Sequence, residues 1–238
     1  MSSPNLFQIS KEEKEKIIEK LIQKSYPGMS FYIMIALASF IAAVGLMIDN
    51  LIIIVGSILI APFLYPIIFL GMSIVLDDFK VIKRTLLIIG KIIALGLSIS
   101  FFSTLLLSPF VKTETPGIFQ EISFLPLFYI AIASGLAATF AISRKSLVEY
   151  LPGVAVSISL ILPLITIGVA IALGKFALAL HCFQLFLINI FGIIFAAILI
   201  FSLMGFARER KVARETLKEE KKSLEKGEIE FEKKKRES

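Results

Sequence analysis

The stretch that decides the fold is Asn50-Leu51-Ile52-Ile53-Ile54-Val55-Gly56-Ser57-Ile58-Leu59-Ile60-Ala61-Pro62-Phe63-Leu64-Tyr65-Pro66. It belongs to an uncharged run that continues to Leu76 and exceeds the roughly 20 residues needed to cross a hydrocarbon core about 30 Å thick. Because no water in that core can satisfy bare backbone groups, the run must form a helix or a strand of a closed barrel. A barrel would show roughly 10-residue stretches of alternating polarity. The continuous run therefore predicts a transmembrane helix.

Five further runs of this kind predict an all-α integral membrane fold with six transmembrane helices. The chain is 57% apolar and its mean hydropathy is +0.87, whereas soluble domains are roughly 45–50% apolar. The predicted spans are Met29–Ile48, Leu51–Leu76, Ile82–Leu107, Phe124–Ile142, Tyr150–Leu173 and Ala177–Phe206. They form a membrane domain over residues 29–206, between an N-terminal segment 1–28 and a charged C-terminal segment 207–238.

The two flanking segments predict a multi-pass protein of the cell membrane with both termini in the cytoplasm. In segment 1–28, Ser10 and Glu13 form a capping-box pattern before an amphipathic helix, which either lies on the membrane surface or packs on the protein. Lysine and arginine favour cytoplasmic loops. A cytoplasmic N-terminus places on that side Lys80, Lys83, Arg84, Arg144 and Lys145, and on the other side Lys112 and Lys175. Segment 207–238 is then a cytoplasmic tail or helix.

The two halves of the membrane domain align without a gap at an offset of 97 residues. Tyr32 falls on Tyr129, and other coincidences are Gly56 with Gly153, Pro66 with Pro163 and Gly71 with Gly168. Each half, about 29–108 and about 124–206, holds three predicted spans. Because three is odd, the second half enters the membrane from the opposite face. The sequence therefore predicts a 3+3 inverted repeat, an arrangement common among secondary transporters.

Prolines are predicted to break the second and fifth spans at corresponding positions. A proline inside a helix removes one backbone hydrogen bond and clashes with the preceding turn. Pro62 and Pro66 lie in the second span and Pro163 lies in the fifth. Carbonyls freed at that depth are tolerated only where protein buries them or a polar cavity faces them. Paired breaks in inverted halves point to a transport site, and a kink sealed by neighbouring helices is the alternative.

The predicted site combines these prolines with small and polar residues near them. We expect it to contain Gly56, Ser57, Pro62, Pro66, Gly153, Ser157, Ser159 and Pro163, together with Asn50, Asn189 and Lys91. Lys91 is the one charge well inside a predicted span, and it either reaches back to the cytoplasmic edge or pairs with an anionic solute. The polar residues could instead join helices to one another. The pair Asp77-Asp78 is interpreted as a solvated helix end, with a divalent cation site as the alternative.

Three segments of this chain resemble one known family. They are the run Asn50 to Pro62, the run Pro152-Gly153-Val154-Ala155-Val156 through Leu162-Pro163-Leu164, and Leu187-Ile188-Asn189. In this order they are similar to the signature of the domain-of-unknown-function-389 family, over roughly Met29 to Phe206. The resemblance implies a bacterial or archaeal multi-span membrane protein and supplies no established activity.

The sequence predicts no cofactor, no metal site and no catalytic set. Cys182 and His181 are the only residues of their kinds, too few for a disulfide or a zinc site within one chain, and no Ser-His-Asp set can be assembled. The net charge of +6 is explained by membrane topology rather than by nucleic acid.

These observations favour a non-enzymatic transporter or channel for a small solute or ion, in contact with the lipid bilayer. A membrane scaffold or sensor that acts through charged cytoplasmic tails is the alternative, and a lipid-modifying enzyme is the least supported reading. The oligomeric state stays open, a homo-oligomer included.

Overall fold

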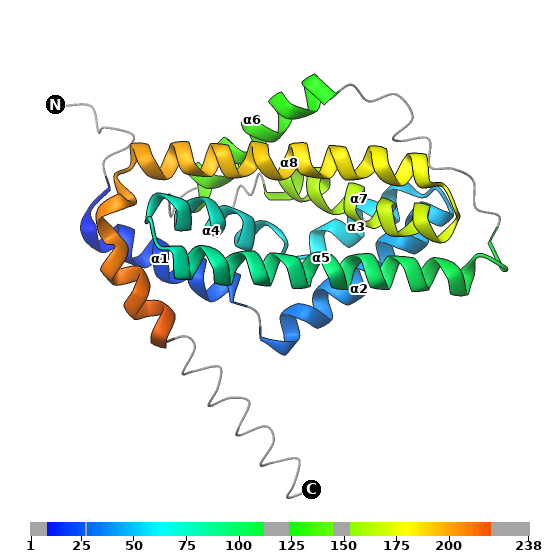
Figure 1. The fold of residues 1–238 in the computed structure, drawn as a ribbon, viewed down its shortest axis with the longest axis horizontal. Helices are drawn as coiled ribbons and strands as arrows, with labels where there is room; N and C mark the ends of the chain where they lie inside the picture. The colour runs from blue at the N-terminus through cyan, green and yellow to red at the C-terminus, as the bar shows by residue number, and fades with distance from the viewer. Residues whose placement is uncertain (1–8, 27, 112–123, 145–152, 220–238) are drawn as a thin grey trace, which may run out of the picture.

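The described part of the chain is entirely helical and forms one elongated bundle (Figure 1). The computed structural model describes residues 9–26, 28–111, 124–144 and 153–219, and only the backbone of residues 153–159. The helices are α1 (Lys11–Ser25), α2 (Met29–Met47), α3 (Leu51–Ile60), α4 (Leu64–Val75), α5 (Phe79–Leu107), α6 (Phe124–Ile142), α7 (Gly153–Ala172) and α8 (Phe176–Leu203). A 3-10 turn, η3 (Phe206–Glu209), leads into a last helix over residues 210–219.

Four of these helices, α2, α5, α6 and α8, are long and apolar enough to cross a membrane, and the bent pair α3 and α4 makes a fifth span if it is counted as one. The outer faces of the bundle carry large apolar side chains, such as Leu106 and Phe191, which are 70% and 63% exposed. A lipid environment accounts for this exposure, because water would penalise it. The chain is therefore a multi-pass membrane protein. The sixth span stays a prediction.

The second predicted span is divided into two helices that meet at 52°. Helix α3 ends at Ile60, and Ala61 adopts an extended conformation with φ −83° and ψ 118°. A proline disfavours the helical conformation of the residue before it, which accounts for a helix end next to Pro62. Pro66 has a different place from the one expected, because it is the third residue of α4. A proline in the first helical turn costs little, since that turn has unpaired N–H groups in any case.

The fifth predicted span has no such interruption, so the expectation of a broken helix at Pro163 is wrong. Helix α7 continues through Pro163. One proline in a helix packed between neighbours removes a single backbone hydrogen bond, and the flanking turns can retain theirs. Leu164 and Ile165 on its C-terminal side are buried at 2% and 1% exposure, so neighbouring helices support this turn.

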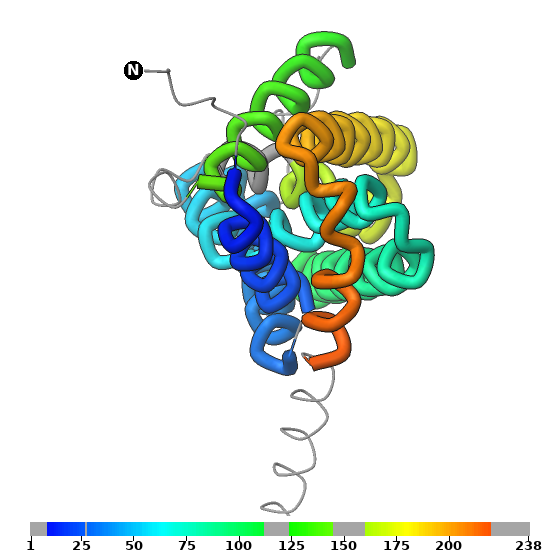
Figure 2. Tube along the Cα trace, turned by 90° about the vertical axis from the view of Figure 1, so that its left-hand side faces the viewer, coloured from blue at the N-terminus to red at the C-terminus, as the bar shows by residue number. Residues whose placement is uncertain are grey.

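One end of the bundle is covered by two segments that come from opposite ends of the chain. Helix α1 and the helix 210–219 both lie across this end, which Figure 2 shows face on. Ser10 and Glu13 form the capping box expected at the start of α1. The apolar stripe of α1 faces the protein, because Ile18, Leu21 and Ile22 are fully buried. Of the two readings of this helix, the structure has the one packed on the protein.

Helices α5 and α8 run in opposite directions along the whole bundle (Figure 1). The start of α5 and the end of α8 therefore lie at the covered end, beside α1. We call this assembly of α1, the turn between α4 and α5, and residues 206–219 the end cap.

Candidate functional site

Of the residues predicted to form a central site, those whose side chains the structure describes lie on several helices and on different faces of them. Gly56 lies on an exposed face of α3, where an added methyl group would meet nothing within 4 Å. Ser57 is fully buried, and its hydroxyl donates to the carbonyl of Ile54 in its own helix at 2.6 Å. Asn50 caps the start of α3 and accepts from the backbone N–H groups of two residues in its first turn. The hydrogen bonds of Ser57 and Asn50 thus serve the local structure of α3.

Two further predicted residues, both on long helices, face in different directions. Lys91 lies on the outer face of α5, in a shallow groove with Lys83 and Gly90. It is exposed and does not point into the bundle, so both of its readings, a reach back to the membrane edge and a pairing with an anionic solute, stay predictions. Asn189 lies in the interior on α8 and is 2% exposed. Gly153, Ser157 and Ser159 lie outside the residues whose side chains the structure describes.

The break between α3 and α4 adjoins a very small apolar void. The void measures about 10 Å³ and is lined by residues that include Ala61, Phe63, Ser39 and Gly96. A water molecule needs roughly 10–15 Å³ and several polar partners, so the described side chains leave no aqueous path at this depth.

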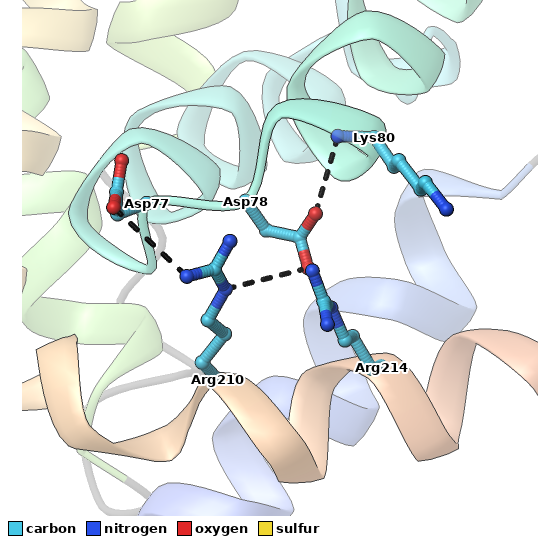
Figure 3. A network of polar contacts seen from close by, with 5 residues as sticks. All are labelled: Asp77, Asp78, Lys80, Arg210 and Arg214. Carbon is cyan, nitrogen blue, oxygen red and sulfur yellow. Dashed lines mark hydrogen bonds and ion pairs between the residues drawn. The ribbon is translucent and has the colours of Figure 1, made fainter.

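The best-formed polar arrangement lies in the end cap, around Asp78 (Figure 3). Asp78 caps the start of α5, and its Oδ1 accepts from the backbone N–H of Lys80 at 3.1 Å. Its Oδ2 accepts from Nε of Arg214, and Nε of Arg210 lies 3.8 Å away. Its side chain is only 2% exposed. Neighbouring Asp77, by contrast, is 97% exposed and lies 4.0 Å from Arg210.

The electrostatics of this arrangement favour the charged form of Asp78. The Arg214 guanidinium, through its hydrogen bond, holds the pKa of the Asp78 carboxyl below its usual value, and burial opposes this effect. The same contact raises the pKa of Arg214. Asp78 therefore stays ionised at neutral pH and fastens the helix 210–219 to the start of α5.

Beside this pair lies a cleft of about 320 Å³ between the end of α1, the start of α5 and the helix 210–219. Its lining residues are Tyr26, Asp78, Lys80, Val81, Arg84, Arg214, Leu217 and Lys218. The guanidinium of Arg84 lies 4.4 Å from the centre of the Tyr26 ring, a cation–π contact that fixes both groups. The cleft thus combines four cationic side chains with one carboxylate that is already paired.

The sequence-based interpretation of Asp77-Asp78 as a solvated helix end is right for Asp77 and wrong for Asp78. The signal that could have revealed the pair is the spacing of Arg210 and Arg214, which lie four residues apart and so share one helix face. Nothing in the sequence around Asp78 shows that the helix face with Arg210 and Arg214 packs against it. As to the cation alternative, no group of three His, Cys, Asp or Glu residues that could hold a metal is found within the described residues.

Comparisons with known proteins give a family but no activity. The profile of the family described as "Domain of unknown function (DUF389)" matches residues 58–195. The chain is similar to "Uncharacterized protein MJ0678" of Methanocaldococcus jannaschii, with 27% identity over 212 residues that cover 85% of this chain and 65% of that relative. No solved structure matches.

Proposed function

The chain belongs to the DUF389 family of unknown function, and from its fold we propose that it is a transporter or channel for a small solute or ion, built from two inverted units. The first unit is α2 to α5 and the second is α6 to α8. The proposed site lies where α3, α4 and α7 meet. The observation that carries the proposal is the equivalence of the two units in their contacts.

Two turns support this equivalence, since they repeat the same backbone hydrogen bonds 97 residues apart. Leu76 N donates to Met72 O, and Leu173 N donates to Val169 O. Asp77 N donates to Ile74 O as Gly174 N does to Ile171 O. Asp77 and Gly174 both have positive φ, 50° and 71°. The turn before α5 and the turn before α8 therefore have the same construction.

Two close contacts between the units are related by the same offset. A methyl group on Gly71 of α4 would come within 2.5 Å of Ala197 Cβ and 3.2 Å of Ile194 O on α8. A methyl group on Gly168 of α7 would overlap the Ser100 hydroxyl and come within 2.9 Å of Leu97 O on α5. Each of the four partners lies 97 positions from its counterpart. Helix α4 thus meets α8 as α7 meets α5, the pattern that a pseudo-two-fold axis produces.

The broken span supplies the second support. Phe63 at the start of α4 makes no side-chain capping hydrogen bond, which leaves first-turn N–H groups of this half-helix available to a ligand. Half-helix ends at this depth are the usual ion and substrate contacts of transporters. Because the adjacent void is closed, transport requires the two units to shift against each other along contacts made by small residues.

We assign the end cap to the cytoplasmic side. Arg84, Arg144, Arg210 and Arg214 lie at this end, together with the lysines of α1, while Lys175 precedes α8 at the other end. Excess lysine and arginine mark cytoplasmic segments. The same placement puts both termini in the cytoplasm, and we propose no enzymatic activity.

Flux measurements test the proposal. Proteoliposomes are assayed for K⁺, Na⁺, chloride and inorganic phosphate, with Pro62→Ala as the test variant. Pro126→Ala is the matched control, because Pro126 lies in the first turn of α6 on the exposed side. We expect flux of one of these probes, lowered at least about tenfold by a continuous helix at position 62 and unchanged in the control. Equal flux in all variants contradicts the site.

A second measurement needs no knowledge of the solute. Ser39 lines the void beside Ala61, so a Ser39→Cys variant in a Cys182→Ser background reports on water access. We expect modification by a membrane-impermeant thiol reagent from one or both sides as the units shift. If the thiol reagent does not modify position 39 in the folded, membrane-inserted protein, the transport proposal is contradicted.

A second candidate function, a sensor or scaffold that acts through the cytoplasmic segments, is favoured by one observation. The buried carboxylate of Asp78 holds the helix 210–219 against the membrane bundle, so the position of that helix can report the state of the bundle. Absence of water access at Ser39 together with a bundle-dependent position of helix 210–219 favours this candidate over transport.

A further inference from the structure

The cationic side chains that line the end-cap cleft outnumber the carboxylates that could pair with them. Lys80 and Arg84 reach it from α5, and Arg214 and Lys218 reach it from the helix 210–219. Asp78 is the one carboxylate among its lining residues, and it already accepts from Arg214 and from the Lys80 backbone. Among the described residues, four cations against one engaged anion leave a surplus of positive charge in this cleft.

The geometry of the two arginines leaves donors for a ligand. Arg214 uses Nε toward Asp78, and within the described residues no hydrogen bond engages its terminal nitrogens. Arg84 is positioned by the ring of Tyr26 rather than by a carboxylate, and a stacked guanidinium keeps its N–H donors available at the edge. Planar guanidinium groups that are fixed by neighbours are well suited to bind phosphate oxygens in pairs.

Tyr26 gives an independent indication of a missing partner. It lines the cleft, is 4% exposed, and its hydroxyl has no hydrogen-bond partner among the described residues. A buried hydroxyl without a partner costs free energy, so most such groups in native proteins are satisfied by water or by a ligand. The hydroxyl itself is buried, so a bound anion would reach it after a small shift of the ring or through a water molecule that it orders.

We infer that the cleft lined by Tyr26, Lys80, Arg84, Arg214 and Lys218 is a binding site for a phosphate group, which ties the helix 210–219 to α5. The inference does not depend on transport. The ligand bridges two elements that otherwise meet through Asp78, and it therefore favours the docked position of the helix. The phosphate group comes from one of two sources, an anionic lipid headgroup at the membrane surface or a soluble phosphate compound.

The source follows from two arms of one experiment on the full chain. In nanodiscs of phosphatidylcholine, inorganic phosphate and pyrophosphate are titrated as soluble probes. In the second arm, phosphatidylglycerol replaces part of the phosphatidylcholine. In both arms hydrogen exchange of residues 210–219 is measured, because a ligand that ties this helix to α5 slows its exchange. Slowing in the first arm alone identifies a soluble source, and slowing in the second arm alone identifies a lipid.

The test variant is Lys80→Gln/Lys218→Gln, which removes two lining cations whose ammonium groups make no hydrogen bond or ion pair in the described chain. The charge-matched control is Lys83→Gln/Lys211→Gln, on the same two elements and outside the cleft. We expect binding roughly tenfold weaker in the test variant and little changed in the control. Equal loss in both variants, or no slowing with any probe in the unmodified protein, overturns the inference.

Discussion

The turn before α5 and the turn before α8 have the same backbone conformation, but they lie at opposite ends of the bundle and are followed by residues of opposite charge. Both end a helix with one residue at positive φ, Asp77 or Gly174, and both repeat their hydrogen bonds at the same offset. Yet the residue that follows is Asp78 in one and Lys175 in the other. Around Asp78, α1 and the segment 206–219 cover the bundle end, and the carboxylate is buried between arginines.

This difference shows what a duplication retains and what it lets diverge. The backbone of the turn is set by local hydrogen bonds and by a residue that tolerates positive φ, a role open to glycine and aspartate. The charge at the next position is free to change, because it depends on what covers that end. The interior contacts between the units are retained as the turn backbone is, because small residues recur at equivalent positions. The end cap has no such repeat, because it covers only one end of the bundle.

The largest effects are expected where the two units touch. Gly71→Ala and Gly168→Ala each place a methyl group against the backbone or the Cβ of the opposite unit, so overpacking should destabilise each variant by about 1–3 kcal/mol. If the units are equivalent, the two losses are similar. Thermal unfolding of the purified protein in detergent measures both.

Two other glycines provide the control. Gly56→Ala and Gly90→Ala add the same methyl group where nothing lies within 4 Å. We expect unchanged or slightly raised stability there, because alanine favours a helix over glycine by about 1 kcal/mol. A Gly71 variant as stable as the Gly56 variant would contradict the close approach of α4 and α8.

The next largest effect is expected at Asp78, the residue that distinguishes the turn before α5 from the turn before α8. Asp78→Asn removes the charge that holds Arg214, whereas Asp77→Asn changes an exposed side chain of the same turn. Because Arg214 is half exposed, solvent screens part of the interaction, and we expect a loss of about 1 kcal/mol. Hydrogen exchange of residues 210–219 should then be roughly fivefold faster in Asp78→Asn and unchanged in Asp77→Asn. Equal rates in both variants would show that the buried ion pair does not hold this helix.

The sequence predicted most of the fold because helical membrane segments follow from local composition. Continuous apolar runs such as Leu51 to Leu76 need only the solvent argument, and the capping box of Ser10 and Glu13 needs only its own neighbours. The break near Pro62 was predictable for the same reason. The continuity of α7 through Pro163 was not, because it depends on packing by residues far away in the sequence.

The surroundings of the candidate site residues could not be predicted for a related reason. Gly56 and Lys91 were selected by type and depth, and neither property says which face of a helix turns inward. Asp78 was set aside because its partners, Arg210 and Arg214, lie more than 130 residues further along the chain. A long-range ion pair leaves no periodic pattern, so only the assembled end cap reveals it.

The pH dependence of the end cap follows from the lowered pKa of Asp78. Since its pKa in the folded state is below the ordinary 3.8, the stabilising contribution is complete above about pH 4 and disappears as the pH falls through the folded-state pKa. Exchange of residues 210–219, corrected for its intrinsic pH dependence, should therefore rise in acid. The Asp78→Asn variant should lack this part of the rise. An identical acid response in both proteins would assign the effect to other carboxylates.

The smallest effect is expected at Lys91, where the units also differ. Its counterpart 97 positions later is Ile188, so Lys91→Ile copies into the first unit what the second unit has. Lys91 lies on the outer face of α5 and does not support the interior. The free energy of unfolding should therefore change by no more than about 0.5 kcal/mol, measured by thermal unfolding in detergent. Flux, if the transport proposal holds, should be unchanged as well. A large loss of either would mean that Lys91 faces a partner, an anion or a second copy of the chain, and would restore it to the functional residues that its depth first suggested.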